Sequence, residues 1–141
     1  MSEVKVSEGV GASAEAVWKL LRDFGGIQKW SGGGIESCSV EGEGIGAVRT
    51  IGIAGGASLQ ERLEAFDDER RTFSYSIPGA SPLPVTDYLS TVEVTETGPD
   101  SSRVDWSASF EPKGISEEQA QQIVRGIYTG GIGGLKKTLG V

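Results

Sequence analysis

The stretch S-E-E-Q-A-Q-Q-I-V-R-G-I-Y-T-G-G-I-G-G-L-K-K-T-L, residues 116–139, predicts one long helix near the end of the chain. Ser116 is followed three residues later by Gln119, which is the capping-box pattern of a helix start. Apolar residues then recur at helical spacing as far as Leu139. The predicted apolar stripe consists of Ile123, Ile127, Leu135 and Leu139.

The chain before this helix consists of short alternating apolar and polar runs separated by turn-forming residues. Such alternation predicts strands, and short turns between consecutive strands imply antiparallel pairing. After the first strand, Ser13 offers an N-cap for a short helix, and residues 27–30 add one further helical turn. The predicted strands span residues 4–10, 35–40, 47–53, 58–66, 72–77, 85–96 and 103–111. We therefore expect an α+β fold, in which a curved seven-stranded antiparallel sheet wraps around the long C-terminal helix, with two short helices after the first strand.

Composition narrows the chemistry that this sheet and helix can support. The 141 residues suit a single domain spanning residues 1–141, and a net charge of −7 argues against nucleic acid as a partner. The absence of histidine excludes Ser-His-Asp machinery and His-ligated zinc, while a single cysteine, Cys38, excludes an intrachain disulfide and a CxxC zinc site. A carboxylate-only Mg²⁺ or Ca²⁺ site stays open. We expect no cofactor, no membrane insertion and a cytoplasmic location, because neither a signal segment nor a long apolar run is found.

Strand periodicity assigns one face of the predicted sheet to an internal pocket, because side chains alternate strictly between the two faces. Most of the residues on that face are apolar or aromatic, and four are polar. The predicted pocket residues from the strands are Arg49, Ile51, Ile53, Glu61, Leu63, Tyr75, Tyr88, Ser90, Trp106 and Phe110.

Arg49 and Glu61 are the two charged residues on this inward face. If the third and fourth strands turn about Gly56, Ile51 faces Glu61 and Arg49 lies diagonal to it, within reach of an ion pair. A buried charge without a partner costs more than the roughly 1–3 kcal/mol of an unpaired neutral group. The pair is therefore either an internal structural bridge or a set of polar handles for a ligand, and periodicity does not separate these two interpretations.

Gly126, Gly130 and Gly134 recur every four residues within the predicted long helix. Each glycine costs about 1 kcal/mol relative to alanine inside a helix, so the repeat needs an explanation. One explanation is a bare helix face that leaves room for a ligand, which places Gly130 and Gly134 among the pocket residues. The alternatives are close contact between the helix and the sheet, or a helix that breaks near Gly130.

The order of elements, together with several short motifs, resembles the START/birch-pollen-allergen (SRPBCC) superfamily and, within it, the polyketide cyclase/dehydrase-like branch. The motifs lie at residues 13–30, 59–68 (LQERLEAFDD), 88–92 (YLSTV) and 134–136 (GLK). Residues 35–41 (IESCSVE) and 61–71 (ERLEAFDDERR) are also distantly similar to the plant abscisic acid receptors of this superfamily.

The resemblance implies a helix-grip fold with a central cavity, lined in the receptors at the positions of Glu61, Tyr88 and Ser90. Three receptor features are missing from this sequence. A shorter loop at residues 54–57 replaces the receptors' gate, their latch is absent from residues 79–83, and their carboxylate-binding lysine falls near Gly32. Abscisic acid binding is therefore not expected.

The first hypothesis for function is binding or transport of a hydrophobic small molecule such as a lipid, an isoprenoid or a polyketide-like aromatic. The alternative is an aromatic polyketide cyclase or dehydratase in which Glu61 is the general base and Tyr88 or Arg49 stabilises an enolate. A chaperone-like interaction module is a third hypothesis. Whether the chain is an enzyme, and whether it forms a homodimer, stays open at this point.

Overall fold

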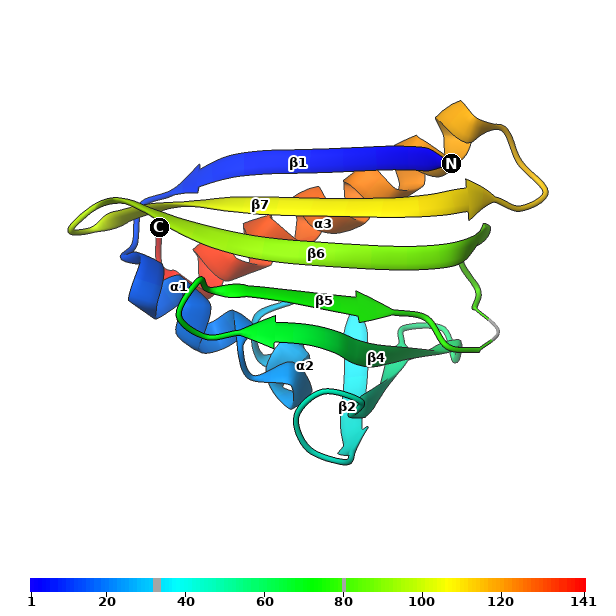
Figure 1. Cartoon of the computed structure of the whole chain (residues 1–141), viewed down its shortest axis with the longest axis horizontal. Coiled ribbons are helices and arrows are strands. Elements are labelled where there is room, and N and C mark those ends of the chain that lie inside the picture. Colours follow the sequence, from blue (N-terminus) through cyan, green and yellow to red (C-terminus); the bar gives the residue numbers. More distant parts are fainter. Residues whose placement is uncertain (32–33, 80) are drawn as a thin grey trace.

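The computed structural model describes residues 1–31, 34–79 and 81–141, which form one seven-stranded antiparallel sheet curved around a long helix (Figure 1). The predicted α+β helix-grip fold is confirmed, including the short helices after the first strand. The elements are β1 (Ser2–Val10), α1 (Ala14–Leu21), the 3₁₀ turn η1 (Phe24–Gly26), α2 (Ile27–Trp30), β2 (Ile35–Glu41), β3 (Val48–Ile53), β4 (Ser58–Asp67), β5 (Thr72–Ser76), β6 (Val85–Gly98), β7 (Ser101–Pro112) and α3 (Glu117–Leu139).

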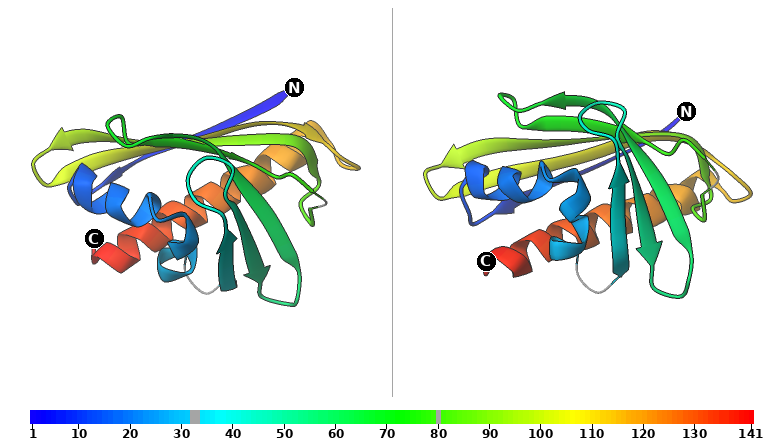
Figure 2. Two further views of the ribbon diagram at one scale, coloured as in Figure 1. Left: turned by 60° about the horizontal axis from the view of Figure 1, so that its bottom comes forward. Right: turned by 90° about the horizontal axis from the view of Figure 1, so that it is seen from below.

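The strands lie in the order β1-β7-β6-β5-β4-β3-β2, so β2 to β7 form a continuous meander and β1 pairs with the last strand. Every neighbouring pair is antiparallel. Figure 2 shows α3 running along the concave side of this sheet, with α1 and α2 beside its C-terminal half. The space between sheet and helix is therefore enclosed on one side by strands and on the other by α3.

Both predicted helix starts are confirmed by their hydrogen bonds. Ser13 Oγ accepts a hydrogen bond from Ala16 N at 3.1 Å, which begins α1. The capping box of α3 is complete, because Ser116 Oγ accepts from Gln119 N and Gln119 Oε1 accepts from Ser116 N. At its other end α3 stops at Gly140, whose φ of 74° is a left-handed value that glycine adopts without strain. The helix is continuous between these caps, so it does not break near Gly130.

The buried face of α3 differs from the predicted apolar stripe. Ile123 and Ile127 are each 42% exposed, and Leu139 is only partly buried. The stripe that meets the sheet consists of Ala120, Val124, Tyr128, Ile132 and Leu135. The two stripes lie side by side on the helix surface and share Leu135. The second stripe faces the sheet because Tyr128, which belongs to it, forms hydrogen bonds with hydroxyl groups on β6. Counting apolar residues at helical spacing does not include such hydrogen bonds.

The inward faces predicted for the strands are confirmed by burial, and a bulge in β6 is needed to produce one of them. The β6–β7 register shifts between Thr86 and Leu89, and Asp87 has a φ of 53°. This extra residue lets both Val85 and Tyr88 point inward, since a regular strand would turn Tyr88 to the opposite face from Val85. The bulge therefore directs Tyr88 toward α3.

Within the described part of the chain, none of the helices combines the length and the apolar character that crossing a bilayer requires.

Candidate functional site

A cavity of about 320 Å³ lies between the concave face of the sheet and α3, with α2 along one side. Seven of the residues that the sequence assigns to a pocket line it together. They are Ile51, Ile53, Glu61, Tyr75, Tyr88, Trp106 and Gly130. These side chains come from β3, β4, β5, β6, β7 and α3, so six elements converge on one space. Its size is at the lower end of the range for sites that hold drug-sized molecules.

The other five predicted pocket residues do not line this cavity. Leu63 and Phe110 pack in the hydrophobic core, and Arg49 and Ser90 are buried beside lining residues to which they are hydrogen-bonded. Gly134 lies against the backbone of α2, so close that a Cβ at this position would clash with the Trp30 carbonyl oxygen. These five residues support the walls of the cavity from outside it.

Arg49 and Glu61 form the buried ion pair that the sequence places within reach. The predicted pairing of Ile51 with Glu61 is wrong. In the structure Arg49 of β3 lies directly opposite Glu61 of β4, and Ile51 lies opposite Leu59. The turn is centred on Gly55 rather than Gly56, and moving the centre by one residue shifts every pairing by two. A shift of two keeps all side chains on their predicted face.

The Arg49 guanidinium is held on several sides, which fixes the carboxylate of Glu61. Arg49 Nε donates to Glu61 Oε1 at 2.8 Å, Nη2 is ion-paired with the same oxygen at 2.6 Å, and Nη1 donates to the Phe24 carbonyl oxygen at 3.0 Å. The guanidinium also lies over the rings of Phe24 and Tyr75, at 4.1 Å and 5.2 Å from their centroids. Because both bonds to the carboxylate go to Oε1, Glu61 Oε2 receives no hydrogen bond from the described residues.

Hydroxyl groups from four residues form a second polar cluster beside the cavity, at Tyr75, Tyr88, Ser90 and Tyr128. Tyr128 Oη donates to Ser90 Oγ at 2.9 Å, and Tyr88 and Tyr128 are hydrogen-bonded through their hydroxyls. Trp106 Nε1 donates to both Ser90 Oγ, at 3.0 Å, and Tyr75 Oη, at 3.2 Å. The indole of Trp106 stacks on the Tyr128 ring with centroids 4.9 Å apart.

Burial raises the pKa of these phenols, so they stay protonated to a higher pH than a free tyrosine does. Burial, reinforced by the negative charge of Glu61, raises the pKa of Tyr75 to about 12. Burial also raises the pKa of Tyr88 and of Tyr128 well above the usual value for tyrosine. The cavity wall therefore combines one carboxylate oxygen that can accept a hydrogen bond with the Tyr75 phenol, which accepts from Trp106 and can still donate its own proton.

Sequence reasoning missed ten of the lining residues, most of them from helices and loops. Trp30 ends α2, Ser31 follows it, and Leu83 lies in the loop before β6. Tyr128, on the overlooked stripe of α3, is a missed member of the hydroxyl cluster beside the cavity. The helical spacing of Val124, Tyr128 and Ile132 was a usable signal for Tyr128. The remaining missed lining residues are Ile27, Gly34, Ile35, Leu59, Gly126, Ile127 and Gly131.

Two polar atoms of the missed residues have no hydrogen-bond partner. Trp30 Nε1 and Ser31 Oγ are both buried and unpaired within the part of the chain that the structure describes, although both residues line the cavity. Trp30 itself is 3% exposed. A buried polar atom without a partner destabilises a fold by roughly 1–3 kcal/mol, so each of these two atoms carries a cost that no hydrogen bond within the described residues offsets.

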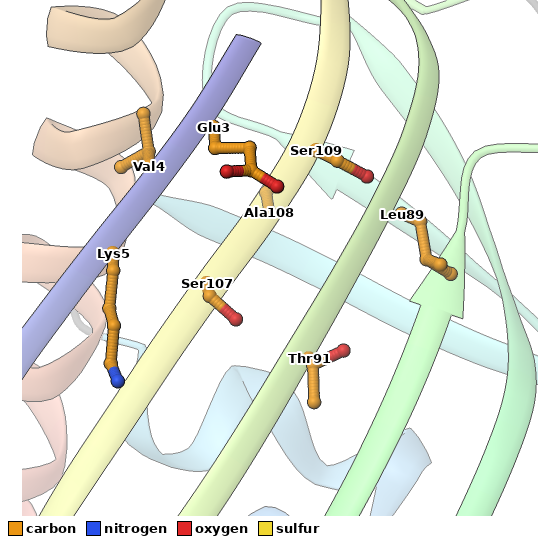
Figure 3. Close-up of a pocket in the computed structure, with 8 residues that line it drawn as sticks. All are labelled: Glu3, Val4, Lys5, Leu89, Thr91, Ser107, Ala108 and Ser109. Atoms are coloured by element: carbon orange, nitrogen blue, oxygen red, sulfur yellow. The ribbon is translucent and has the colours of Figure 1, made fainter. Parts of the chain in front are cut away.

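A second hollow lies on the outer, convex face of the sheet, across β1, β7 and β6 (Figure 3). Its polar side chains, including Glu3, Lys5, Thr91 and Ser107, stand on the solvent side of the strands. None of the unpaired buried polar atoms found in the described residues belongs to this hollow. We therefore take the internal cavity, and not this surface, as the candidate site.

The described residues contain no cluster of three Cys, Asp or Glu side chains arranged to hold a metal ion. The loop that replaces the receptor gate, residues 54–57, forms a tight turn in which Gly55 and Gly56 have φ values of 100° and 96°. Gly32, at the receptors' lysine position, and Ala80, within residues 79–83, lie outside the described residues.

Comparison with known proteins agrees with the fold. A family model described as polyketide cyclase/dehydrase and lipid transport matches residues 1–140. The protein XoxI from Bacillus cereus is 37% identical, with a TM-score of 0.88 over 97% of this chain and 94% of that one. A protein from Bacillus thuringiensis is 36% identical, with a TM-score of 0.89 over 96% and 97% of the two chains.

The fold also extends to a plant enzyme. Norcoclaurine synthase from Thalictrum flavum, solved in complex with dopamine and hydroxybenzaldehyde, is 21% identical, with a TM-score of 0.74 over 97% of this chain and 85% of that chain. At this identity the likeness shows the helix-grip fold alone. Because the family model matches nearly the whole chain, the protein belongs to the polyketide cyclase/dehydrase and lipid transport family, as its sequence motifs predict.

Proposed function

We propose that this protein binds a small hydrophobic molecule that carries one hydroxyl group, with its apolar body in the cavity and its hydroxyl on Glu61. The observation that carries the proposal is the position of Glu61, a residue only 7% exposed whose carboxylate reaches a cavity walled mainly by apolar and aromatic side chains. Glu61 Oε2 accepts no hydrogen bond from the described residues and belongs to a residue that lines the cavity, so a ligand hydroxyl could donate to it.

The structure favours a handle on the ligand over a purely structural bridge because of how Arg49 is used. An ion pair that only stabilised the fold would gain most by engaging both carboxylate oxygens, as bidentate arginine–carboxylate pairs do. Here both bonds go to Oε1, and the third bond of the guanidinium goes to the Phe24 carbonyl oxygen. Arg49 therefore orients Glu61 and leaves Oε2 available to a ligand.

Calorimetric titration with 2-naphthol, a small aromatic molecule with one hydroxyl, tests this function. Native mass spectrometry of the purified protein would first show whether a molecule co-purifies and must be removed. The Glu61→Gln variant keeps an amide oxygen for Arg49 but turns a donor toward the ligand hydroxyl. We expect it to weaken 2-naphthol binding by about tenfold, the effect of one lost hydrogen bond to a charged group.

The matched control is Glu64→Gln, which makes the same chemical change on the outward face of the same strand, where Glu64 accepts a hydrogen bond from Ser76. It should bind 2-naphthol as the wild type does. Wild-type protein that binds no hydrophobic hydroxyl compound, after removal of any co-purified molecule, would show that this function is wrong.

A second candidate function is an aromatic polyketide cyclase or dehydratase. The observation in its favour is that Glu61 Oε2 stands free to take a proton while Tyr75, which accepts from Trp106 and keeps its own proton, lines the same cavity as a donor for an enolate oxygen. Turnover of a poly-β-keto thioester that Glu61→Gln abolishes would establish this activity. Binding without turnover would leave the carrier function.

A further inference from the structure

The glycines of α3 have different surroundings, although three of them, Gly126, Gly130 and Gly134, recur regularly in the sequence. A Cβ at Gly134 would clash with the Trp30 carbonyl oxygen, and one at Gly131 would come within 3.0 Å of the Trp106 ring. A Cβ at Gly126, Gly130 or Gly133 would meet nothing within 4 Å. Close packing therefore explains the first two glycines and leaves the other three without a packing reason.

Two of these three open glycines face the cavity. Gly126 and Gly130 line it, whereas Gly133 does not. The same stretch of α3 contributes Ile127, which also lines the cavity and is 42% exposed, so the cavity reaches the surface of the protein along this part of the helix. At Gly126 and Gly130 the wall is helix backbone without a side chain, beside the Ile127 side chain.

Two independent observations connect this bare wall with a ligand. The cavity holds a carboxylate oxygen of Glu61 that the described residues do not pair, and Glu61 is 7% exposed. It is also lined by Trp30, which is 3% exposed and whose Nε1 has no acceptor among the described residues. Glu61 and Trp30 line the same cavity as Gly126 and Gly130.

We propose that Gly126 and Gly130 determine which ligands fit, by leaving space for the end of the molecule that is remote from its hydroxyl group. This inference rests on the proposed function and deepens it. It assigns the ligand to flat, elongated hydrophobic molecules, such as fused or linked rings with one hydroxyl. The hydroxyl lies at Glu61, and the far ring lies against the bare backbone of α3 and extends toward the opening beside Ile127.

Two probes that share a polar end and differ in length test the assignment by calorimetric titration. 2-Naphthol is the short probe, and 6-phenyl-2-naphthol extends it by one ring away from the hydroxyl. We expect Gly130→Leu to weaken binding of the long probe by about tenfold or more, since an added side chain of this size in a hydrophobic pocket discriminates at that level. Binding of the short probe should stay within about twofold of the wild type.

Gly133→Leu is the matched control, because it makes the same substitution at an open glycine of the same helix outside the cavity. It should bind both probes as the wild type does. Gly130→Ala adds a smaller side chain, so it should weaken binding of the long probe less than Gly130→Leu does. Retained binding of the short probe shows that each variant is folded.

The results separate this inference from the function on which it rests. If the wild type binds both probes and Gly130→Leu weakens both equally, or neither, the role of the glycines is refuted while ligand binding stands. If the wild type binds neither probe, the proposed function is refuted, and the glycine assignment is refuted with it.

Discussion

Replacing Gly134 by alanine should destabilise the protein, although alanine is the better helix former. In an open helix position this substitution adds about 1 kcal/mol of stability. At Gly134 the new Cβ would clash with the Trp30 carbonyl oxygen and lie 3.1 Å from the Ser31 carbonyl carbon. These are backbone atoms, so no side-chain rotation relieves the contact, and α2 must move away from α3.

The magnitude follows from setting these two effects against each other. Overpacking of a well-packed site costs about 1–3 kcal/mol, which outweighs the gain in helix propensity over most of that range. We expect a net loss of about 1 kcal/mol for Gly134→Ala, and a net gain of about 1 kcal/mol for Gly133→Ala, where the Cβ meets nothing within 4 Å. The two substitutions in adjacent residues should therefore have opposite signs.

Urea unfolding followed by far-ultraviolet circular dichroism measures both free energies. Equal slopes against urea concentration would show that the midpoints report stability alone. If Gly134→Ala were as stable as Gly133→Ala, the close approach of α2 to α3 would not be the reason for this glycine, and the packing argument would be refuted.

Two further predictions concern the polar groups around the cavity. Arg49→Met leaves Glu61 buried without its partner and should lower the free energy of unfolding by about 3–5 kcal/mol. The double variant Arg49→Met/Glu61→Leu removes both charges, so its free energy of unfolding should fall much less. Equal losses for the two variants in urea unfolding would contradict this account of the pair. The pKa of Tyr75, about 12 in the folded protein against an ordinary value of 10.0, means that the unfolded chain releases this proton first. The free energy of unfolding should therefore fall as the pH rises from 10 to 12, less steeply in Tyr75→Phe, and an identical fall in both proteins would contradict the burial argument.

The sequence by itself determined the elements and the inward faces of the strands. Period-two alternation and turn residues place the strands to within a few residues, because a strand face depends only on the alternation of neighbouring side chains. The capping box of Ser116 and Gln119 is equally local, and it marks the start of α3 correctly. The family motifs are local as well, so they too are readable without a structure.

Only the tertiary structure decided the β3–β4 register and the buried face of α3. Turns centred on Gly55 or Gly56 satisfy the same alternation, since both leave Arg49 and Glu61 on the inner face. Two adjacent stripes of α3 have helical spacing, and the choice between them depends on Tyr128 reaching Ser90 on β6. Contacts between residues distant in the sequence settle such choices.

The glycines of α3 show the same division most clearly. In the sequence Gly126, Gly130 and Gly134 form one repeat, and three explanations stay open for it: room for a ligand, close contact with the sheet, or a break in the helix. In the structure Gly134 packs against α2, while Gly126 and Gly130 face the cavity. A missing side chain has no pattern of its own, so its role depends on what the rest of the fold places beside it.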